Sequence, residues 1–581
     1  MPSPSVDPKL SDLRERMRHS AAHVLAEAVM KLFPEAKPTI GPPTEDGFYY
    51  DFDVPAPFTP DDIQRIEALM RESIAQDLPF TQERVTRERA REAFKDNPYK
   101  IEMIGELPED EPITVVRHGD FRDLCRGGHV DSTGRIGAFK LLNTAGAYWR
   151  GDERNPMLQR IYGTAWESQS ELDACLERRA EAERRDHRRL GREQDLFFLD
   201  PISPASPFFL PKGALVYNLL VDYVRGLYRR YGYQEIITPE IYSTDLWKRS
   251  GHYDNYIENM YLIEIDEREY GVKPMNCPAA AMVYASTLRS YRDLPIRLAD
   301  FGRLHRYERS GVTHGLTRVR SFAQDDAHIF CTPEQVGSEV RNFIGMLTES
   351  CRYLGFNQMR FVLSLRPEKR IGSDETWDRA EQTLETVLAE AGLDFETAPG
   401  EGAFYGPKID HLVPDAIGRE WQLGTVQLDF AMPERFDLEY VAEDGGRRRP
   451  VMLHRTMLGT IERFMGVFIE HTVGAFPLWL APVQATLIPI ADRHLPYART
   501  VADRLERAGF RVEVDDSSER MNAKIRTAQL QKVPYMLVVG DREEHTGEVA
   551  VRLRDGRDLG PMPLQQLLER MRGELSAPSG A

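Results

Sequence analysis

The stretch Phe301-Gly-Arg-Leu-His-Arg-Tyr-Glu308, followed after a loop by Arg318-Val-Arg-Ser-Phe-Ala-Gln-Asp-Asp-Ala-His328, decides how this chain folds. Its residue pattern predicts two polar strands joined by a flexible loop, an arrangement that would hold Arg306 and Arg318 over a polyphosphate. Arginine suits this role because its planar guanidinium pairs with phosphate oxygens through two parallel hydrogen bonds. Phe322 is placed to stack on a base.

A second segment, Leu458-Gly-Thr-Ile-Glu-Arg-Phe464, places Arg463 at the start of a helical pattern. There Arg463 could close the other face of the same base. Taken singly, each arginine is more often a surface charge. Taken together, the ordered set of arginines and an aromatic residue favours a nucleotide-binding site.

Three metal-capable side chains accompany this pattern, each in a separate segment. Cys277 lies in Pro-Met-Asn-Cys-Pro, His328 in Gln-Asp-Asp-Ala-His-Ile-Phe and His454 in Val-Met-Leu-His-Arg. One thiolate and two imidazoles make a three-ligand zinc site with one open position, where substrate recognition or chemistry takes place. The spacing alone does not establish the site, so the prediction depends on the neighbours of each residue.

Length and composition indicate a multidomain protein of ordinary globular type. The chain has 581 residues, 41% of them apolar and 29% charged. Its apolar runs fall far short of the ~20 residues that span a bilayer, and Met1–Leu10 shows no signal peptide, so we expect no membrane partner. Five thinly spread cysteines, an odd number, suggest a reducing cytoplasm and thiols used for metal binding or catalysis.

The net charge bears on the class of partner. A formal charge of −17 argues weakly against a nucleic-acid partner. The charge is uneven, however, because arginines crowd residues 176–192. A solvated helix face with pairs such as Glu181–Arg185 is one explanation, and a local basic surface is the other. The charge pattern leaves both open.

The first region, residues 1–166, predicts an α+β domain. A helical pattern runs through Leu32, and Phe48–Val54 has a strand-like pattern. A second helix begins at Thr59-Pro-Asp-Asp62, where threonine can cap, proline suits the first turn and the second aspartate can reach back. The following residues, 167–192, are charged and lack an apolar stripe, which predicts a linker helix.

The third region, residues 193–478, is the largest. Strands such as 359–365 and 421–430 do not alternate regularly with helices, so an α+β fold with an antiparallel sheet is favoured over a doubly wound one. The last region, residues 479–581, alternates strand and helix from Ala485 to a closing helix near Pro563. It predicts a small α/β domain with a mostly parallel sheet.

The chain resembles the class II aminoacyl-tRNA synthetases, whose motifs appear in order. The first is Tyr231-Gly-Tyr-Gln-Glu-Ile-Ile-Thr-Pro239, the second is the unit from Arg306 to Phe322, and the third is Gly459-Thr-Ile-Glu-Arg463. Within that class, the resemblance from residue 16 to about residue 575 is to the threonyl-tRNA synthetase family. Its specific motifs here are Met275-Asn-Cys-Pro278, Asp325-Asp-Ala-His-Ile-Phe330, Phe404-Tyr-Gly-Pro-Lys408 and Met452-Leu-His454.

The resemblance implies a role for each matching residue. Arg306 binds the α-phosphate and neutralises charge as the mixed anhydride forms, Glu308 reads the adenine edge, and His252 assists transfer to the terminal ribose of tRNA. The zinc ligands are Cys277, His328 and His454. The residues that bind ATP, which carries Mg²⁺, are Arg306, Glu308, Arg318, Phe322, Gln422 and Arg463. The threonine-binding residues are Met275, Gln324, Asp326, Tyr405 and Gln427, and the catalytic residues are Arg306, Lys408, His252 and Arg463.

A threonine enzyme faces two competing substrates. Valine has nearly the shape of threonine, and an apolar pocket separates such isosteres by only ~100-fold. A zinc ion that ligates both the amino group and the hydroxyl penalises valine, which lacks the hydroxyl. Serine keeps the hydroxyl and lacks one methyl group, worth only ~1–3 kcal/mol. A separate hydrolytic site is therefore expected.

The N-terminal region offers that site. His19-Ser-Ala-Ala-His23 places two imidazoles on one helix face, and Cys125-Arg-Gly-Gly-His129 adds a thiol and a third imidazole. On residue types alone, a structural zinc site is the first interpretation. The resemblance implies instead an editing domain that hydrolyses seryl-tRNA without a required metal, with Lys100 and Asp123 as further site residues. Zinc there remains an alternative.

The C-terminal region resembles the anticodon-binding module of class II synthetases, in which Glu543 and Arg552 would read base edges. The family often has asparagine near Ser518, which puts that base contact in doubt. Many bacterial relatives carry a small domain ahead of the editing region, for which Met1–Leu10 leaves no room. The resemblance further implies tRNA(Thr), L-threonine and ATP as partners, a homodimer formed through the first motif, and a cytoplasmic location.

Three other functions compete with this one. A regulatory paralogue without catalysis would be expected to break Arg306, Arg463 or the zinc ligands, and none is broken. A prolyl- or seryl-specific synthetase is disfavoured by the zinc residues and by the N-terminal histidine pairs. A free-standing hydrolase would not explain residues 193–478.

Overall fold

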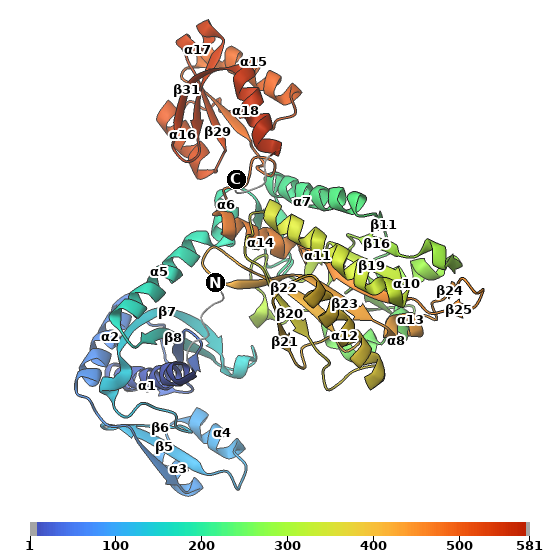
Figure 1. Cartoon of the computed structure of the whole chain (residues 1–581). Helices are drawn as coiled ribbons and strands as arrows, with labels where there is room; N and C mark the ends of the chain where they lie inside the picture. The colour runs from blue at the N-terminus through green and yellow to red at the C-terminus, as the bar shows by residue number, and fades with distance from the viewer. Residues whose placement is uncertain (1–7, 577–581) are drawn as a thin grey trace. The chain divides into compact units, whose positions relative to one another are not determined.

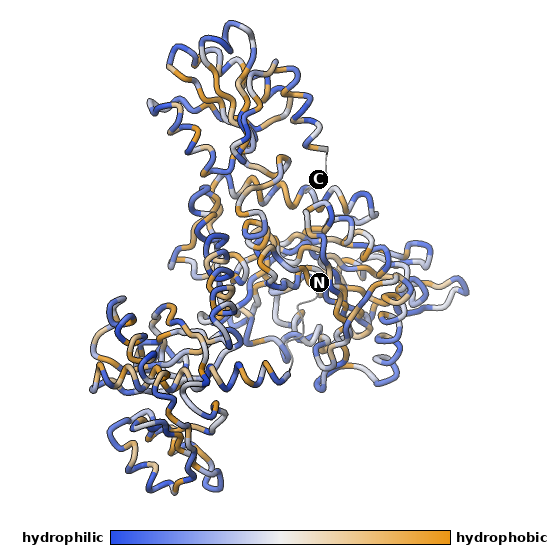
Figure 2. Tube along the Cα trace, turned by 60° about the vertical axis from the view of Figure 1, so that its left-hand side comes forward, coloured by the Kyte–Doolittle hydropathy of each residue, from blue (hydrophilic) through white to orange (hydrophobic). Residues whose placement is uncertain are grey.

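The computed structural model describes residues 8–576, and its internal contacts divide the chain into two units, residues 1–181 and 182–581. The division falls inside the segment 167–192 that was predicted as a linker. The expectations placed on Met1–Leu10 lie mostly outside the described residues. Hydrophobic segments gather in the interior of each part of the chain (Figure 2).

The first unit is built on one long helix packed against an antiparallel sheet (Figure 1). Helix α1, Pro8–Leu32, buries its Val24, Leu25 and Val29 side chains there. The strands of the sheet, in spatial order, are β1 Lys37–Pro38, β3 Gly47–Asp53, β8 Met157–Trp166 and β7 Ala138–Tyr148, with β2 Pro43–Thr44 paired to β3. The predicted strand at 48–54 therefore lies inside the sheet.

The predicted helix at Thr59 is α2, Pro60–Ala75, and it begins with the expected capping box. The Thr59 hydroxyl accepts from the Asp62 backbone N–H at 3.2 Å, and the Asp62 carboxylate accepts from the Thr59 N–H at 2.9 Å. The reciprocal bonds satisfy donors that a helix start otherwise leaves unpaired.

A smaller antiparallel sheet completes the first unit. Its strands are β4 Thr81–Val85, β5 Ile113–His118 and β6 Phe121–Leu124, joined through helices α3 Arg87–Ala93 and α4 Pro98–Glu106. Asn97 caps α4 by accepting from the Tyr99 and Lys100 backbone N–H groups. This cap fixes the start of the helix that carries Lys100.

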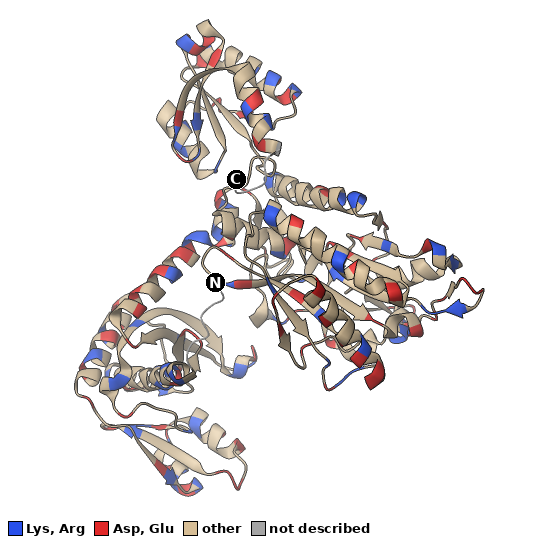
Figure 3. Cartoon of the chain, in the orientation of Figure 1, with Lys and Arg blue, Asp and Glu red and all other residues tan. Residues whose placement is uncertain are grey.

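The predicted linker forms two helices, α5 Gln169–Arg185 and α6 His187–Glu193. Basic and acidic residues are mixed along α5 (Figure 3). The linker differs from the expectation in two respects. Leu172 and Cys175 are buried with Trp166, so the start of α5 has a small apolar contact face. Asp186 has non-helical backbone angles (φ −50°, ψ 116°) and caps α6, which ends one helix and starts the next.

The second unit contains the antiparallel sheet that was predicted for residues 193–478. Its eight strands, in spatial order, are β11 Gln234–Glu235, β16 Ile296–Asp300, β19 Asp326–Cys331, β26 Val451–Thr456, β23 Glu420–Asp429, β22 Lys408–Pro414, β20 Arg360–Ser364 and β21 Phe395–Ala398. Only the outermost pair at each edge is parallel. Helices α7 Pro211–Arg230, α11 Val336–Tyr353, α12 Asp374–Glu390 and α14 Ile461–Thr472 share its hydrophobic core.

The C-terminal sheet is mixed, where a mostly parallel one was expected. Its order is β28 Val512–Val514, β27 Ala485–Pro489, β29 Tyr535–Val539, β30 Glu548–Leu553 and β31 Asp558–Pro563. The first three strands are parallel, joined through α15 Leu495–Arg507 and α16 Met521–Leu530, and the last two pairs are antiparallel. The connection from β29 to β30 is too short for a parallel crossover, which needs about a dozen residues.

Helix α18, Leu564–Ser576, closes this domain, as predicted. Among the described helices of the chain, none combines the length and the apolar character that crossing a bilayer would require.

Candidate functional site

Strand pairing brings the predicted metal ligands together in the second unit. His328 on β19 lies directly opposite His454 on β26 in the antiparallel register, and their ring centroids are 4.9 Å apart. Cys277 is the first residue of helix α10, Cys277–Ala285. The three ligating atoms lie within 4.8 Å of one another, and all three side chains are buried.

The donor set and its surroundings fit a zinc ion. Sulfur and imidazole nitrogen are the ligands that Zn²⁺ prefers, at about 2.0–2.3 Å. The Nδ1 atom of His328 is buried and has no hydrogen-bond partner among the described residues. His454 Nε2 lies 2.8 Å from Asp429 Oδ2, and a carboxylate behind a histidine ligand is the usual support of a zinc site.

His252 lies beside this cluster. Its Nδ1 is 2.8 Å from the Ser250 hydroxyl, and its Nε2 is 4.0 Å from Cys277 Sγ. Burial, followed by the charge of His454, lowers the pKa of His252 to about 3. The imidazole is therefore neutral at physiological pH and can accept a proton.

The predicted phosphate-binding hairpin forms next to the cluster. Strands β17 Arg303–His305 and β18 Ser321–Ala323 pair, with Leu304 opposite Phe322. The Arg306 guanidinium lies 5.1 Å from the Phe322 ring centroid, and its Nε donates to the Pro274 carbonyl at 3.1 Å. Pro274 lies just before Met275 and Cys277, so this bond ties the arginine to the metal cluster.

The hairpin also holds Glu308 and Arg318 together, since Arg318 Nη2 is 3.0 Å from Glu308 Oε2. Phe322 is only 3% exposed and packs with Leu304 and Val319, so most of its surface is already covered. The prediction that it stacks on a base therefore depends on the small part that remains accessible.

Helix α14 brings Arg463 to the same place. The Thr460 hydroxyl caps the helix by accepting from the Arg463 N–H at 3.0 Å, and Gln324 forms an isolated bridge with Thr460. The Nε of Arg463 is buried without a partner among the described residues. Burial and the neighbouring charge of Arg318 lower the pKa of Arg463. Two neighbouring arginines repel each other unless an anion binds between them, so this pair indicates a site for an anionic ligand.

The predicted threonine-pocket residues fall into two groups. Asp326 accepts from Asn276 Nδ2 at 3.2 Å, and Met275 packs beside the α10 cluster. The Tyr405 hydroxyl donates to the side-chain amide oxygen of Gln427, and the Tyr405 ring lies 5.1 Å from that of His454. Both groups therefore line the metal cluster.

Lys408 and Gln422 meet at one carboxylate. Lys408 Nζ is 2.8 Å from Asp410 Oδ2, and Gln422 Nε2 donates to Asp410 Oδ1 at 2.6 Å. Lys408 also lies opposite Gln427 in the register of β22 and β23, which connects this pair to the Tyr405 group.

In the second unit, two residues that support the site were missed by the sequence reasoning. The Asp325 carboxylate accepts from the backbone N–H groups of Met457, Leu458 and Gly459 at 2.9–3.1 Å, and so fixes the turn before α14. Arg455 is fully buried 4.0 Å from Asp325, and its guanidinium lies 4.5 and 4.1 Å from the ring centroids of Tyr228 and Tyr233. Both residues stand inside motifs that were recognised, next to His328 and His454, but no local pattern distinguishes them.

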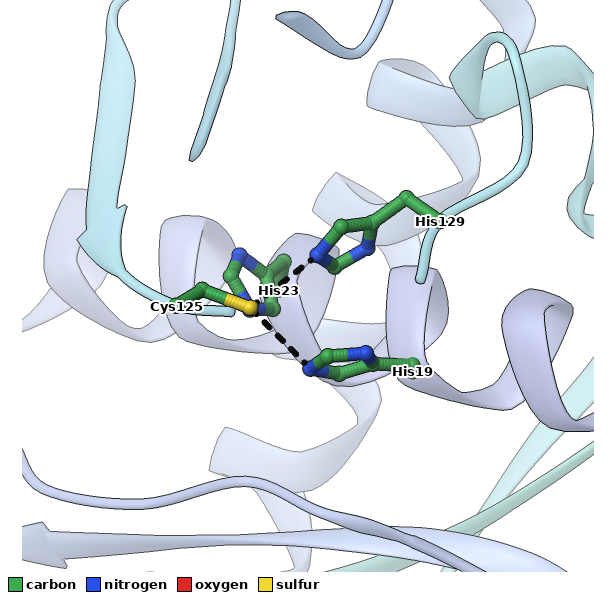
Figure 4. A group of neighbouring side chains, drawn as sticks. All are labelled: His19, His23, Cys125 and His129. Carbon is green, nitrogen blue, oxygen red and sulfur yellow. Dashed lines mark hydrogen bonds between the residues drawn. The ribbon is translucent and has the colours of Figure 1, made fainter. Parts of the chain in front are cut away.

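The first unit brings the four predicted N-terminal residues together (Figure 4). Cys125 Sγ is 3.4 Å from His19 Nε2 and 3.3 Å from His129 Nε2, and the rings of His19 and His129 stack at 4.2 Å. His23 is buried behind them on α1. Burial raises the pKa of Cys125 to about 11 and, together with the charges of His23 and His19, lowers that of His129 to about 2. Thiol and imidazole are therefore uncharged near pH 7.

Lys100 and Asp123 line the same pocket. Lys100 Nζ is 2.5 Å from Asp123 Oδ1, and Asp123 Oδ2 accepts from the Tyr50 hydroxyl at 2.5 Å. Tyr50 is a site residue that the sequence reasoning missed, because its strand pattern gives no hint of the partner. The pocket has a volume of about 740 Å³, and Trp149 and Arg150 also line it.

The predicted anticodon residues lie on different elements. Glu543 belongs to α17, Asp541–Thr546, where its carboxylate accepts from the Gly540 N–H at 3.1 Å and is largely buried. Arg552 on β30 pairs with Asp558 at 3.0 Å. Both side chains would have to leave these partners to contact a base.

Models of three protein families match separate segments of the chain. The tRNA synthetase class II core domain (G, H, P, S and T) matches residues 261–472, and the anticodon binding domain matches residues 484–574. The threonyl and alanyl tRNA synthetase second additional domain matches residues 113–162, which hold Asp123, Cys125 and His129.

Relatives match nearly the whole chain. It is 51% identical over 562 residues to the threonine–tRNA ligase of Methylobacillus flagellatus, covering 96% of this chain and 88% of that protein. It is 53% identical over 564 residues to the threonine–tRNA ligase of Halorhodospira halophila, covering 97% and 88%. Among solved structures, the RNA binding domain of threonyl-tRNA synthetase from Cryptosporidium parvum superposes with a TM-score of 0.66 at 46% identity, covering 68% of this chain and 99% of that one.

Proposed function

Because the chain belongs to the threonine–tRNA ligase family, we propose that it activates L-threonine with ATP and transfers it to tRNA(Thr), and that it hydrolyses seryl-tRNA(Thr). The observation that carries the proposal is the pairing of His328 with His454 beside Cys277, next to the hairpin of Arg306. This arrangement supports a hydroxyl-sensing metal site beside the nucleotide site.

The activation step requires charge neutralisation, because the threonine carboxylate attacks the α-phosphate of ATP as pyrophosphate leaves. Arg306 supplies a fixed positive charge, and Arg318 and Arg463 hold the remaining phosphates, which carry Mg²⁺. The buried setting of Arg463 strengthens its attraction for phosphate because little water screens it.

Cys277, His328 and His454 would hold zinc, which supplies a Lewis acid for the threonine amino group and hydroxyl. Asp429 orients His454, and Asp326 and Tyr405 shape the space beside it. For the transfer step, the neutral His252 accepts a proton from the terminal ribose hydroxyl. The other functions considered are not favoured, because the arginines and the metal residues of a catalytic enzyme are all assembled.

The activation proposal is tested by amino-acid-dependent exchange between ATP and pyrophosphate, measured separately with threonine, serine, valine and proline. We expect exchange with threonine and serine and little with valine or proline. Cys277→Ala should lose bound zinc and lower exchange with threonine by at least about 100-fold, because the Lewis acid is gone. Cys351→Ala alters a buried cysteine of α11 outside the cluster, and it should keep the bound zinc and the exchange with threonine. Full activity without zinc would refute the role of the metal.

The editing proposal rests on the pocket of the first unit. The uncharged His19, His23 and His129 can position a water molecule, while the ion pair of Lys100 with Asp123 remains fixed. The family model that covers Asp123, Cys125 and His129 supports a hydrolytic role for this pocket. Our proposal is a site without a required metal, and zinc on His19, His23, Cys125 and His129 is the alternative.

His19→Ala should leave charging with threonine intact and slow the deacylation of seryl-tRNA(Thr) by about 100-fold, the usual contribution of one general base. Burial lowers the pKa of His19, so wild-type deacylation should not fall as the pH drops from 7.5 to 6.5. Deacylation of preformed seryl-tRNA measures both effects. Unchanged serine clearance in the variant would remove the assignment.

We further propose the domain boundaries 1–166, 167–192, 193–478 and 479–581, with Glu543 and Arg552 of the last domain contacting the anticodon. The contact division between residues 181 and 182 supports a boundary within the second segment. A cytoplasmic location follows from the role of such enzymes in translation.

A homodimer formed through the first motif is supported by an exposed apolar edge. Ile237, which follows the edge strand β11, is 95% exposed, and Ile241 on β12, Ile241–Ser243, is 52% exposed. Large apolar side chains in such a position indicate a surface that a second copy covers. Ile237→Asp should therefore give monomers in sedimentation, whereas Leu530→Asp, at an exposed apolar residue of the C-terminal domain, should not. A dimer that survives Ile237→Asp would contradict this interface.

A further inference from the structure

His187 is a buried histidine that neither the metal cluster nor the editing pocket uses. It is the first residue of α6, at the end of the linker segment, and its side chain is 0% exposed. Its Nδ1 lies 2.6 Å from Glu470 Oε1, and its Nε2 accepts from the Leu316 backbone N–H at 2.9 Å. Both ring nitrogens therefore have partners.

These bonds determine the protonation of the ring. A backbone N–H can only donate, so Nε2 carries no proton and Nδ1 carries the one that is donated to Glu470. The ring is thus a bridge with one donor and one acceptor. The ligating atoms of Asp186, His187 and Glu470 lie within 4.8 Å of one another, but these bonds account for the cluster without a cation.

One end of the bridge is the turn of residues 314–318, which belongs to the loop of the ATP-binding hairpin. His314 and Arg318 exchange backbone hydrogen bonds across this turn, and Leu316 between them is fully buried. Gly315 has a φ of +48°, and a Cβ there would stand 2.0 Å from His187 Nε2. The turn is therefore built to pass directly over the imidazole. Two residues after Leu316, Arg318 pairs with Glu308.

The other end of the bridge is helix α14, which carries Arg463 in its first turn. Glu470 lies in its last turns and also pairs with Arg419. The His187 backbone N–H donates to the same Glu470 oxygen at 3.2 Å, and Arg185 donates to the Glu470 and His471 carbonyls. The linker end is thereby fixed to the helix that carries the second ATP-binding arginine.

We propose that His187 is a positioning residue that holds the 314–318 turn against α14 and so sets the distance between Arg318 and Arg463. The role rests on the proposed ATP-dependent activation, because Arg318 and Arg463 are the side chains that would bind the triphosphate. Residues outside a site often fix the position of its binding side chains, and this improves the binding of the substrate.

Two substitutions separate the two ends of the bridge. His187→Asn keeps a donor near the Nδ1 position for Glu470 and removes the acceptor for Leu316. His187→Gln can place its amide oxygen near the Nε2 position and keep that acceptor. Gly315→Ala pushes the turn away from an intact His187 and should reproduce the effect of His187→Asn. His494→Asn is the matched control, because His494 is a buried histidine paired with Glu544 in the C-terminal domain.

The first readout is hydrogen exchange at the Leu316 amide, which needs no activity. We expect loss of protection in His187→Asn and Gly315→Ala, and protection close to wild type in His187→Gln and His494→Asn. The second readout is threonine-dependent pyrophosphate exchange. His187→Asn and Gly315→Ala should raise the KM for ATP about tenfold, with the KM for threonine unchanged. His187→Gln and His494→Asn should keep the wild-type values.

The outcomes are distinct. Unchanged protection of the Leu316 amide in His187→Asn would overturn the inference. An equal loss of protection in His187→Asn and His187→Gln would also overturn it, because it would show that His187 only fills space. An unchanged KM for ATP in Gly315→Ala would overturn the inference as well, because it would show that the position of the turn does not affect ATP binding. A wild-type protein without threonine-dependent exchange would instead reject the proposed function, while the Leu316 exchange would still decide whether the bridge exists.

Discussion

The register between strands β19 and β26 is the constraint on which the rest of the site depends. It sets His328 opposite His454, so that two imidazoles from segments far apart in the sequence face one point. Side chains alternate between the faces of a strand, so a slip of one residue would turn one imidazole to the opposite face. The pairing of β19 with β16 on its other side, and of β26 with β23, holds this register within an eight-stranded sheet. Cys277 then completes the cluster from the start of α10.

Helix α14, which carries the proposed ATP-binding residue Arg463, is attached to this frame through buried polar contacts. Asp325, three residues before His328, accepts from the turn that precedes α14, and Arg455, next to His454, lies against Asp325. A buried ion pair of this kind contributes little net stability, but removing one partner costs about 3–5 kcal/mol. The pair therefore serves to fix the position of α14, and with it Arg463, relative to the metal cluster. His187 acts on the same helix from its far end.

Much of the fold follows from local patterns, and the exceptions have physical causes. The capping box at Thr59, the strand at 48–54 and the antiparallel sheet of the catalytic region were predicted correctly, because each depends on neighbouring residues or on periodicity. The C-terminal sheet was predicted as mostly parallel because the short length of the β29–β30 connection was overlooked. Candidate residues with distinctive motifs were placed near one another. Asp325, Arg455 and Tyr50 were not found, because their roles come from partners 50 or more positions away that no local pattern reveals.

The central claim is that one thiolate and two imidazoles hold a zinc ion beside the ATP-binding hairpin. X-ray absorption at the zinc edge of the purified full-length protein tests it most directly. The account predicts one sulfur neighbour at about 2.3 Å and two imidazole nitrogens at about 2.0–2.1 Å, with lighter atoms completing the shell. A shell without sulfur, or with more than one sulfur, would contradict the site formed by Cys277, His328 and His454.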